Sequence, residues 1–133
     1  MGIINIPRTE IEKSKPIDAG DYLFNITRIG PEKASKDGQS INQRITLTVA
    51  DGSFQGREIT HNVNNKPGAA FFNANLFASA SGFKDNSDLL VAGEDDVNLS
   101  LEALEGKQVG ATILEDVYEG KPQNKVKIFY PVD

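Results

Sequence analysis

The side chains best suited to binding a ligand are lysines, arginines and aromatic rings on predicted strands and turns. Cations strung along a groove suit backbone phosphates, and exposed aromatic rings offer flat faces to unstacked bases. The candidate residues, in chain order, are Lys33, Lys36, Arg44, Arg57, Tyr118, Lys121, Lys125, Lys127 and Phe129. Their types and spacing predict a surface for single-stranded nucleic acid.

The basic candidates differ in how specific the signal is. Lys33 and Lys36 lie beside Glu32 and Asp37, so a solvated charged loop is an equally good interpretation. Arg44 is the clearest candidate, because an outward arginine in the middle of a strand has few local acids to pair with. It is therefore the first residue to test.

The aromatic candidates also have two interpretations. Phe129 could stack on a base, or it could pack against the N-terminal arm or a second subunit. Tyr118 precedes a turn, where its hydroxyl can stay in water while its ring serves either role. Both rings therefore fit either stacking on a base or packing.

These residues are positioned by a predicted meander of three strands over residues 20–59 and its extension to Val63. The run from Ile41 to Val49 alternates strictly, with Ile45 and Leu47 on one face and Arg44 on the other, which is typical of a half-buried strand. The preceding strand is expected over 22–29 and the following one over 54–63. Polar turns connect them.

One helix is expected after the meander, over residues 68–81, because apolar residues recur there at three and four positions. Pro67 suits its first turn and Gly82 its left-handed cap. The helical spacing of Phe71, Phe72 and Phe77 favours core packing over base stacking. A short helical turn over 100–106 then leads into strands over 107–118 and 125–130.

Five strands with a helix between the third and fourth is the chain order of the OB-fold, a small, partly open barrel. Its ligands lie across strands 2 and 3 and are held by two loops, here 30–40 and 119–124. In the last strand, period-2 alternation places Val126, Ile128 and Tyr130 on one face. Lys125, Lys127 and Phe129 then lie together on the outward face.

The length of 133 residues suits one domain, 1–133, with an N-terminal arm over 1–19. Isoleucines in the arm could pin it to the core, or it could be loosely ordered.

The net charge of −5 argues mildly against nucleic acid, but residues 83–105 alone carry −6, so the rest of the chain carries +1. We interpret 83–99 as an acidic surface loop. With no cysteine, no signal peptide and no membrane span, a cytoplasmic protein is expected.

A family resemblance supports the same hypothesis. The residues that carry it are Gly20-Asp21-Tyr22, a lysine-containing loop ending in Gly38, Asp51-Gly52 with Phe54-x-Gly56-Arg57, Leu104-Glu105-Gly106-Lys107, and Tyr118-x-Gly120-x-x-x-Asn124-x-Val126. Their order over residues 18–131 resembles a family of phage-encoded proteins, catalogued as a domain of unknown function, that includes single-stranded-DNA-binding proteins of replication and recombination modules. The resemblance implies an OB-fold, protection of single-stranded DNA in the infected host cell, and no cofactor. Further expected partners are a second copy of the chain and phage or host replication and recombination proteins.

An enzyme is not expected. His61 is the single histidine, and a lone histidine in a strand is more often a packed residue than a base. Asp85 and Asp88 do not match a calcium loop, because Leu89 stands where an oxygen ligand is needed. The stronger alternative is a non-enzymatic β-barrel module for protein interaction, in a virion, in assembly or on a host factor, using the acidic segment 83–105.

Overall fold

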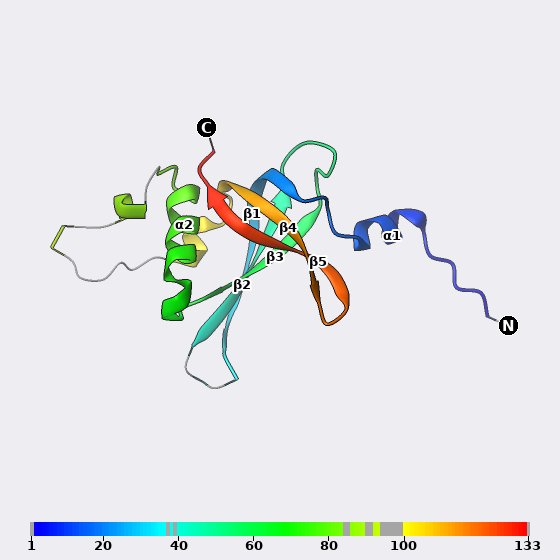
Figure 1. The fold of residues 1–133 in the computed structure, drawn as a ribbon, viewed down its shortest axis with the longest axis horizontal. Helices are drawn as coiled ribbons and strands as arrows, with labels where there is room; N and C mark the ends of the chain where they lie inside the picture. The colour runs from blue at the N-terminus through cyan, green and yellow to red at the C-terminus, as the bar shows by residue number, and fades with distance from the viewer. Residues whose placement is uncertain are drawn as a thin grey trace.

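Five strands and a few short helices make up the computed structural model, which describes residues 2–36, 38, 40–83, 86–89, 92–93 and 100–132 (Figure 1). In chain order the elements are α1 (Arg8–Ser14), β1 (Gly20–Ala34), β2 (Ile41–Val49), β3 (Glu58–Asn64), the 3-10 turn η1 (Pro67–Ala69), α2 (Ala70–Ala80), η2 (Asn86–Leu89), η3 (Leu101–Leu104), β4 (Gln108–Tyr118) and β5 (Lys121–Tyr130). The expected mainly β architecture, with a helix between the third and fourth strands, is confirmed.

The strands form one antiparallel sheet in the order β3-β2-β1-β4-β5. β3 and β5 are its edges, so main-chain ladders do not close the described sheet into a barrel. The edges nevertheless approach each other, because the rings of His61 on β3 and Phe129 on β5 pack edge-on with centroids 5.3 Å apart. The sheet therefore curls until its edges touch without pairing.

The predicted alternation of β2 is confirmed where the strand meets the core. Ile45, Leu47 and Val49 are fully buried, whereas Arg44 is exposed on the opposite face. Alternating side chains point to opposite faces of a strand, so one face of β2 supplies the core and the other remains available to solvent. Other fully buried side chains of the core include Ile17, Phe24, Ile26, Leu76, Val109 and Ile113.

The predicted helix begins as η1 and continues as α2, and Gly82 after it has the expected left-handed conformation, with φ +82°. The N–H of Phe83 donates to the carbonyl of Ala78 at 2.8 Å, which caps the helix end. Core packing is confirmed for Phe77 and, in part, for Phe72. It is wrong for Phe71, which is 69% exposed because it lies on the outer side of α2.

Two asparagines connect α2 to both edges of the sheet. Asn73 Nδ2 donates to the carbonyl of Asn64 at the end of β3, at 2.6 Å. Asn75 Oδ1 accepts from the N–H of Phe129 on β5, at 2.7 Å. An edge strand has unpaired main-chain groups, so these side chains satisfy groups that a further strand would otherwise pair.

The two loops expected to hold a ligand are shorter than predicted. β1 continues to Ala34, which leaves residues 35–40 as the connection to β2. β4 and β5 are joined by Glu119 and Gly120 alone, with φ of 51° and 77°. Positive φ at both central residues is typical of a type I′ turn, whose twist matches that of the flanking strands. Residues 121–124 are therefore strand rather than loop.

The expected outward position of Phe129 is wrong. Thr112 pairs with Ile128 and Ile113 pairs with Val126, so Lys127 is an extra residue in β5. Such a bulge shifts the alternation by one, and residues on either side of it can point inward. As a result Val126 and Phe129 are both buried, at 8% and 1% exposed, and Ile128 is 39% exposed.

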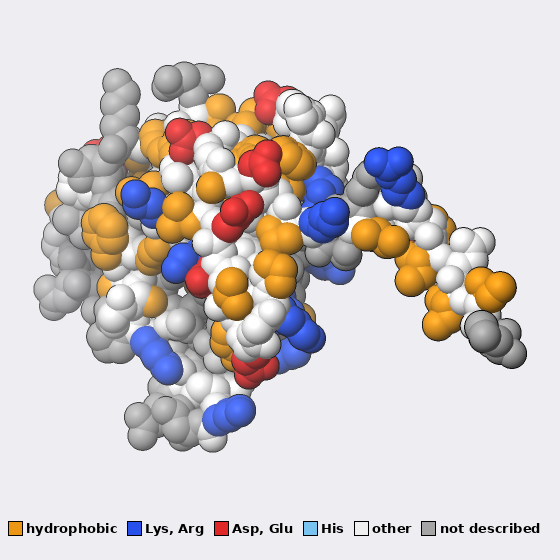
Figure 2. Space-filling view, turned by 45° about the vertical axis from the view of Figure 1, so that its right-hand side comes forward, with side chains coloured by type: hydrophobic (Ala, Val, Ile, Leu, Met, Phe, Trp, Pro, Cys, Tyr) orange, Lys and Arg blue, Asp and Glu red, His pale blue; other side chains and the backbone are white. Residues whose placement is uncertain are grey.

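The N-terminal arm is anchored at its root. Ile17 is 2% exposed and belongs to the core, whereas Ile3 and Ile4 are 92% and 85% exposed. Of the two alternatives for the arm, Ile3 and Ile4 therefore do not pin it to the core, and the arm projects from the body (Figures 1 and 2). The predicted turn over 100–106 is confirmed as η3. Most of the acidic loop 83–99, including Asp85, lies outside the described residues, so its interpretation stays a prediction.

Candidate nucleic-acid interface

A hollow of about 500 Å³ lies on the outward face of β1, β2 and β3. Its lining is polar and basic: Arg28, Gly30, Pro31, Lys33, Asn42, Arg44, Thr46, Glu58, Thr60 and Asn62. Alternation places these side chains here, since Arg44 and Thr60 occupy the face opposite the core-forming residues of their strands. The hollow is thus the solvent side of the meander predicted from the sequence.

A second hollow, of about 520 Å³, continues from the first to the edge of β5. The two share Arg44, Glu58, Thr60 and Asn62. The second adds residues of β3, α2 and β5, namely Ile59, His61, Phe72, Gln123, Asn124, Lys125 and Val126. We call the two together the cross-sheet groove, because they run from β1 across β2 and β3 to β5.

The end of the groove at β1 depends on a close approach of two strands. The pairing register of β1 and β2 shifts between Ile29 and Glu32, and the side chain of Gln43 donates to the freed carbonyl of Gly30 at 2.9 Å. A Cβ at Gly30 would lie 3.0 Å from the carbonyl oxygen of Arg44. Glycine at this position therefore lets the main chain of Arg44 lie against β1.

The charge in the groove is mainly positive. Arg28, Lys33, Arg44 and Lys125 line it, and Glu58 is the acid among the described lining residues. Arg28 pairs with Glu58 at 3.7 Å across an exposed surface. Within the described part of the chain, neither Lys33 nor Arg44 forms an ion pair, so both cations can meet an anionic ligand.

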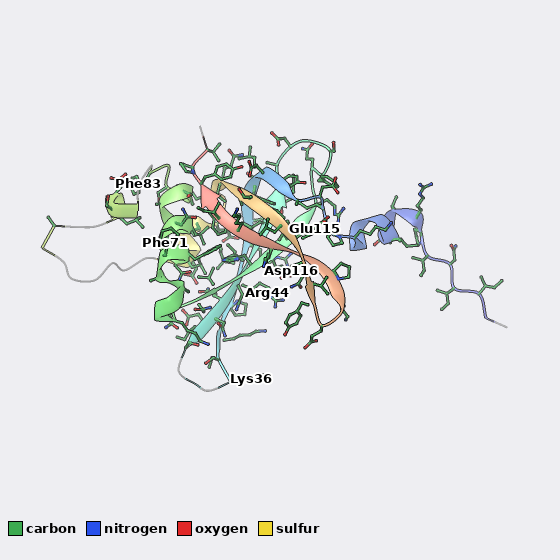
Figure 3. All side chains as sticks on the ribbon, in the orientation of Figure 1. Lys36, Arg44, Phe71, Phe83, Glu115 and Asp116 are labelled. Carbon is green, nitrogen blue, oxygen red and sulfur yellow. The ribbon has the colours of Figure 1, made fainter. Side chains whose placement is uncertain are left out.

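Lys125 lies at the other end of the groove. Its Nζ is 3.5 Å from Oδ2 of Asp116 on β4, and both side chains are partly exposed. Exposed ion pairs of this kind contribute at most about 1 kcal/mol, so a phosphate can replace the carboxylate. Figure 3 shows Arg44 over the middle of the sheet and Lys36 where the β1–β2 connection leaves β1.

Aromatic side chains form part of the groove floor. His61 stacks on Phe72 with centroids 5.2 Å apart and planes at 24°, and Phe129 packs edge-on against both rings. Burial lowers the pKa of His61 to about 4, because removal from water disfavours the charged imidazolium. The histidine is therefore neutral at neutral pH and adds no charge to the groove.

The structure brings only part of the predicted site together. Lys33, Arg44 and Lys125 line the groove. Lys36 is exposed and lies beyond the end of the groove at β1. Arg57 instead donates to the carbonyl of Lys15 at the root of the arm. Arg57 lies immediately before β3, and this bond directs its side chain toward the N-terminal segment.

Three candidates on the hairpin of β4 and β5, Tyr118, Lys121 and Lys127, are exposed but do not line the groove. Tyr118, 62% exposed, pairs across the turn with Lys121, and Lys127 lies on the bulge of β5. Phe129 is buried against His61 and cannot stack on a base. The aromatic component of the predicted site is thus much smaller than the cationic component.

Sequence reasoning missed several groove residues. Arg28 was missed because alternation along 22–29 places it on the face of the buried Phe24 and Ile26, whereas a register shift between Ile26 and Arg28 turns its side chain outward. Asn62 and Gln123 carried no signal, because amides are common on any strand surface. Both are exposed and line the groove with hydrogen-bonding groups.

No model of a known protein family matches the chain, and no curated protein is significantly similar to it. The family resemblance noted above therefore stays a hypothesis based on residue order.

Within the described residues, no group of three or more histidine, aspartate or glutamate side chains is placed to hold a metal ion. Likewise no described helix is long and apolar enough to cross a membrane.

Proposed function

We propose that this chain binds single-stranded DNA along the cross-sheet groove, with little sequence preference and without catalysis. The observation that carries the proposal is the set of cations Arg28, Lys33, Arg44 and Lys125 in two adjoining hollows that share Arg44, in a chain whose net charge is −5. Basic residues are the minority in this chain, so their gathering in the groove favours an anionic ligand there.

A single strand suits the groove better than a duplex does. Backbone phosphates can follow cations spaced from β1 to β5, and the threonines and amides between them can donate to phosphate or base oxygens. Of the two predicted aromatic residues, Tyr118 is exposed at the end of β4 and Phe129 is buried. Because stacking contributes about 1–3 kcal/mol per base, we expect affinity to rest mainly on phosphate contacts and to depend strongly on salt.

We further infer that the domain is a partly open barrel of the OB type. The strand order, the helix between β3 and β4, and the contact of the unpaired edges β3 and β5 all support this inference. OB-folds bind ligands across the faces of their second and third strands, which is where Arg44 and Thr60 lie. Protection of single strands during phage replication or recombination, in the cytoplasm of the infected cell, is the role that the family resemblance adds.

A titration followed by fluorescence anisotropy tests the proposal. A labelled single-stranded oligonucleotide should bind at low salt and should bind more tightly than duplex DNA of equal length. Arg44→Glu should weaken binding, whereas Lys107→Glu, a charge reversal at an exposed lysine outside the described groove lining, should have a smaller effect. Absence of binding at low salt would contradict the proposed function.

A further inference from the structure

The hydrogen bonds at the two ends of the β2–β3 ladder show which residues of β3 face outward. The N–H of Asn65 donates to the carbonyl of Ile41 at 3.3 Å. At the other end, the N–H of Val49 donates to the carbonyl of Arg57 at 2.9 Å. Bonded and non-bonded pairs alternate along an antiparallel ladder, and the register of this ladder is unbroken between its ends. The odd-numbered residues of β3 thus bond to β2, and the main-chain groups of the even-numbered residues point to the outer edge.

The outer edge of β3 therefore carries unpaired main-chain groups. Its end near α2 is covered, because the carbonyl of Asn64 accepts from Nδ2 of Asn73 at 2.6 Å. Further along, no main-chain group in the described part of the chain pairs with the N–H and C=O of Glu58, Thr60 or Asn62. All three residues are exposed. An exposed edge of this kind is a template for pairing with another extended segment.

A gap separates this edge from the edge of β5, and we call it the seam. It holds the second hollow of the cross-sheet groove, of about 520 Å³. The ring contact of His61 with Phe129 closes the seam at the end next to α2. Between the ring contact and the start of β3, the hollow leaves room for a ligand beside the unpaired groups.

The other end of the seam already holds a segment of main chain. Arg57, just before β3, donates to the carbonyl of Lys15. Asn124, on β5, bonds both main-chain groups of Ile17 at 2.9 Å. Residues 15–17 are thus held from both edges at once, and the N-terminal arm leaves the domain from this point (Figure 1).

The first residues of the arm form a segment suited to strand pairing. Ile3, Ile4 and Ile6 are 92%, 85% and 56% exposed, and they stand clear of the body in Figure 2. Isoleucine is β-branched and favours strands. In an extended segment Ile4 and Ile6 share one face, and Ile3 and Asn5 share the other. Pro7 follows and has no N–H to donate, so pairing would end there.

We propose that residues 2–6 of one copy add as a strand to the outer edge of β3 in a second copy. Main-chain hydrogen bonds would provide the affinity, and alternate side chains would set the register. Each arm leaves its own domain beside Arg57, at the start of β3. Two copies related by a two-fold axis can therefore exchange arms, each entering the seam of the other, which gives a closed dimer.

The mixed lining of the seam fits the alternation of the arm. The apolar side chains that line the hollow lie on its core side and are Ile59, Phe72 and Val126. Ile4 and Ile6 would face these side chains and leave water. Thr60 and Asn62 belong to the outward face of β3, so Ile3 and Asn5 would remain at the surface beside them.

The docked arm would occupy the end of the cross-sheet groove at β5. A single strand bound there would compete with the arm, whereas the hollow over β1 and β2 would stay open. The docking itself needs no nucleic acid and does not depend on the proposed function, so both experiments below use the protein alone.

Sedimentation velocity over a range of protein concentrations tests the docking. The wild-type chain should form a dimer, and Ile4→Asp with Ile6→Asp should be monomeric, because carboxylates cannot face the apolar side of the seam. Ile3→Asp with Asn5→Asp is the matched control, since it makes the same change in charge on the other face of the segment. It should still form the dimer. All four positions are exposed, so both variants should fold.

Amide hydrogen exchange measured by NMR locates the contact on β3. Where about nine-tenths of the chains are paired, the N–H groups of Thr60 and Asn62 should exchange about tenfold more slowly than in the dilute monomer, because exchange proceeds from the free fraction. The N–H groups of Ile59 and Val63 face β2 in both states. They are the internal controls and should not change with protein concentration.

Three results would overturn the inference. A wild-type chain that stays monomeric up to about 1 mM would show that the arm has no second-copy partner. Equal association of the two double variants would exclude an alternating strand as the contact. A dimer in which exchange at Thr60 and Asn62 does not slow would place the contact away from β3. Each result can occur whether or not the chain binds single-stranded DNA, so docking and proposed function fail separately.

Discussion

Asn124 of β5 and Ile17 ahead of β1 exchange two hydrogen bonds through one side-chain amide. The N–H of Ile17 donates to Oδ1 of Asn124 at 2.9 Å, and Nδ2 donates to the carbonyl of Ile17 at 2.9 Å. The amide thus pairs with the incoming chain as a neighbouring strand would. It fixes the buried Ile17 and, with it, the direction of the arm.

Replacing Asn124 with alanine removes both bonds and leaves the main chain of Ile17 unpaired. At about 0.5–1.5 kcal/mol for each bond, the free energy of unfolding should fall by about 1–3 kcal/mol. Urea denaturation measures this change. Gln123→Ala, at the exposed neighbouring position, is the control and should stay within about 0.5 kcal/mol of the wild type. Equal stability of the two variants would contradict a structural role for Asn124.

His61 predicts a loss of stability in mild acid. Its pKa is lowered from 6.5 to about 4 in the folded chain, so below 6.5 the unfolded chain binds a proton that the folded chain does not. Stability is therefore complete above 6.5 and falls as the pH approaches 4. Between about pH 7 and pH 5 the loss from this group should be about 2 kcal/mol.

His61→Phe keeps an aromatic ring between Phe72 and Phe129 but cannot titrate. The variant should lose less stability than the wild type over the same pH range, as measured by urea denaturation at each pH. Carboxyl groups titrate in both proteins, so the difference between the two profiles isolates the histidine. Parallel profiles would mean that the folded chain binds a proton at His61 as readily as the unfolded chain.

The alternation of β2 and the cap at Gly82 could be predicted because each depends on a short stretch of sequence. The buried position of Phe129 could not be predicted, because one extra residue at Lys127 shifts the alternation and the register is set by pairing with β4. Nothing near Lys127 in the sequence marks the bulge. The error removed the main stacking residue from the predicted site.

The groove itself was predictable only in part. The outward position of Arg44 follows from the alternation of β2, whereas Lys33 was expected in the loop 30–40 and lies on β1. Arg28 could not be found from alternation, because the register shift between Ile26 and Arg28 depends on pairing with β2. The bond of Arg57 to Lys15 joins segments 42 residues apart, so local patterns do not indicate it. The sequence placed Asn124 in the turn 119–124. In the structure β5 begins at Lys121, directly after Gly120, so Asn124 lies on a strand and bonds to Ile17.

Glu58 opposes binding in the proposed groove, because it adds a negative charge and pairs with Arg28 at 3.7 Å. Glu58→Gln should therefore tighten the binding of a single-stranded oligonucleotide at low salt. An exposed ion pair contributes at most about 1 kcal/mol, which corresponds to an increase in affinity of up to about fivefold. Anisotropy titration measures it, and Glu105→Gln, an exposed acid outside the described groove lining, should have a smaller effect. Weaker binding by Glu58→Gln would indicate that the carboxylate contacts the ligand.

The salt dependence of binding tests the central claim most directly, because each phosphate contact with a single strand contributes about −0.7 to the slope of log affinity against log salt. Arg44→Gln should weaken binding and make the slope less steep by about 0.7 if Arg44 contacts one phosphate. Lys107→Gln carries the same change in net charge outside the described groove lining and should leave the slope unchanged. Equal changes in slope for the two variants, or a wild-type chain that does not bind single-stranded DNA at low salt, would contradict binding along the cross-sheet groove.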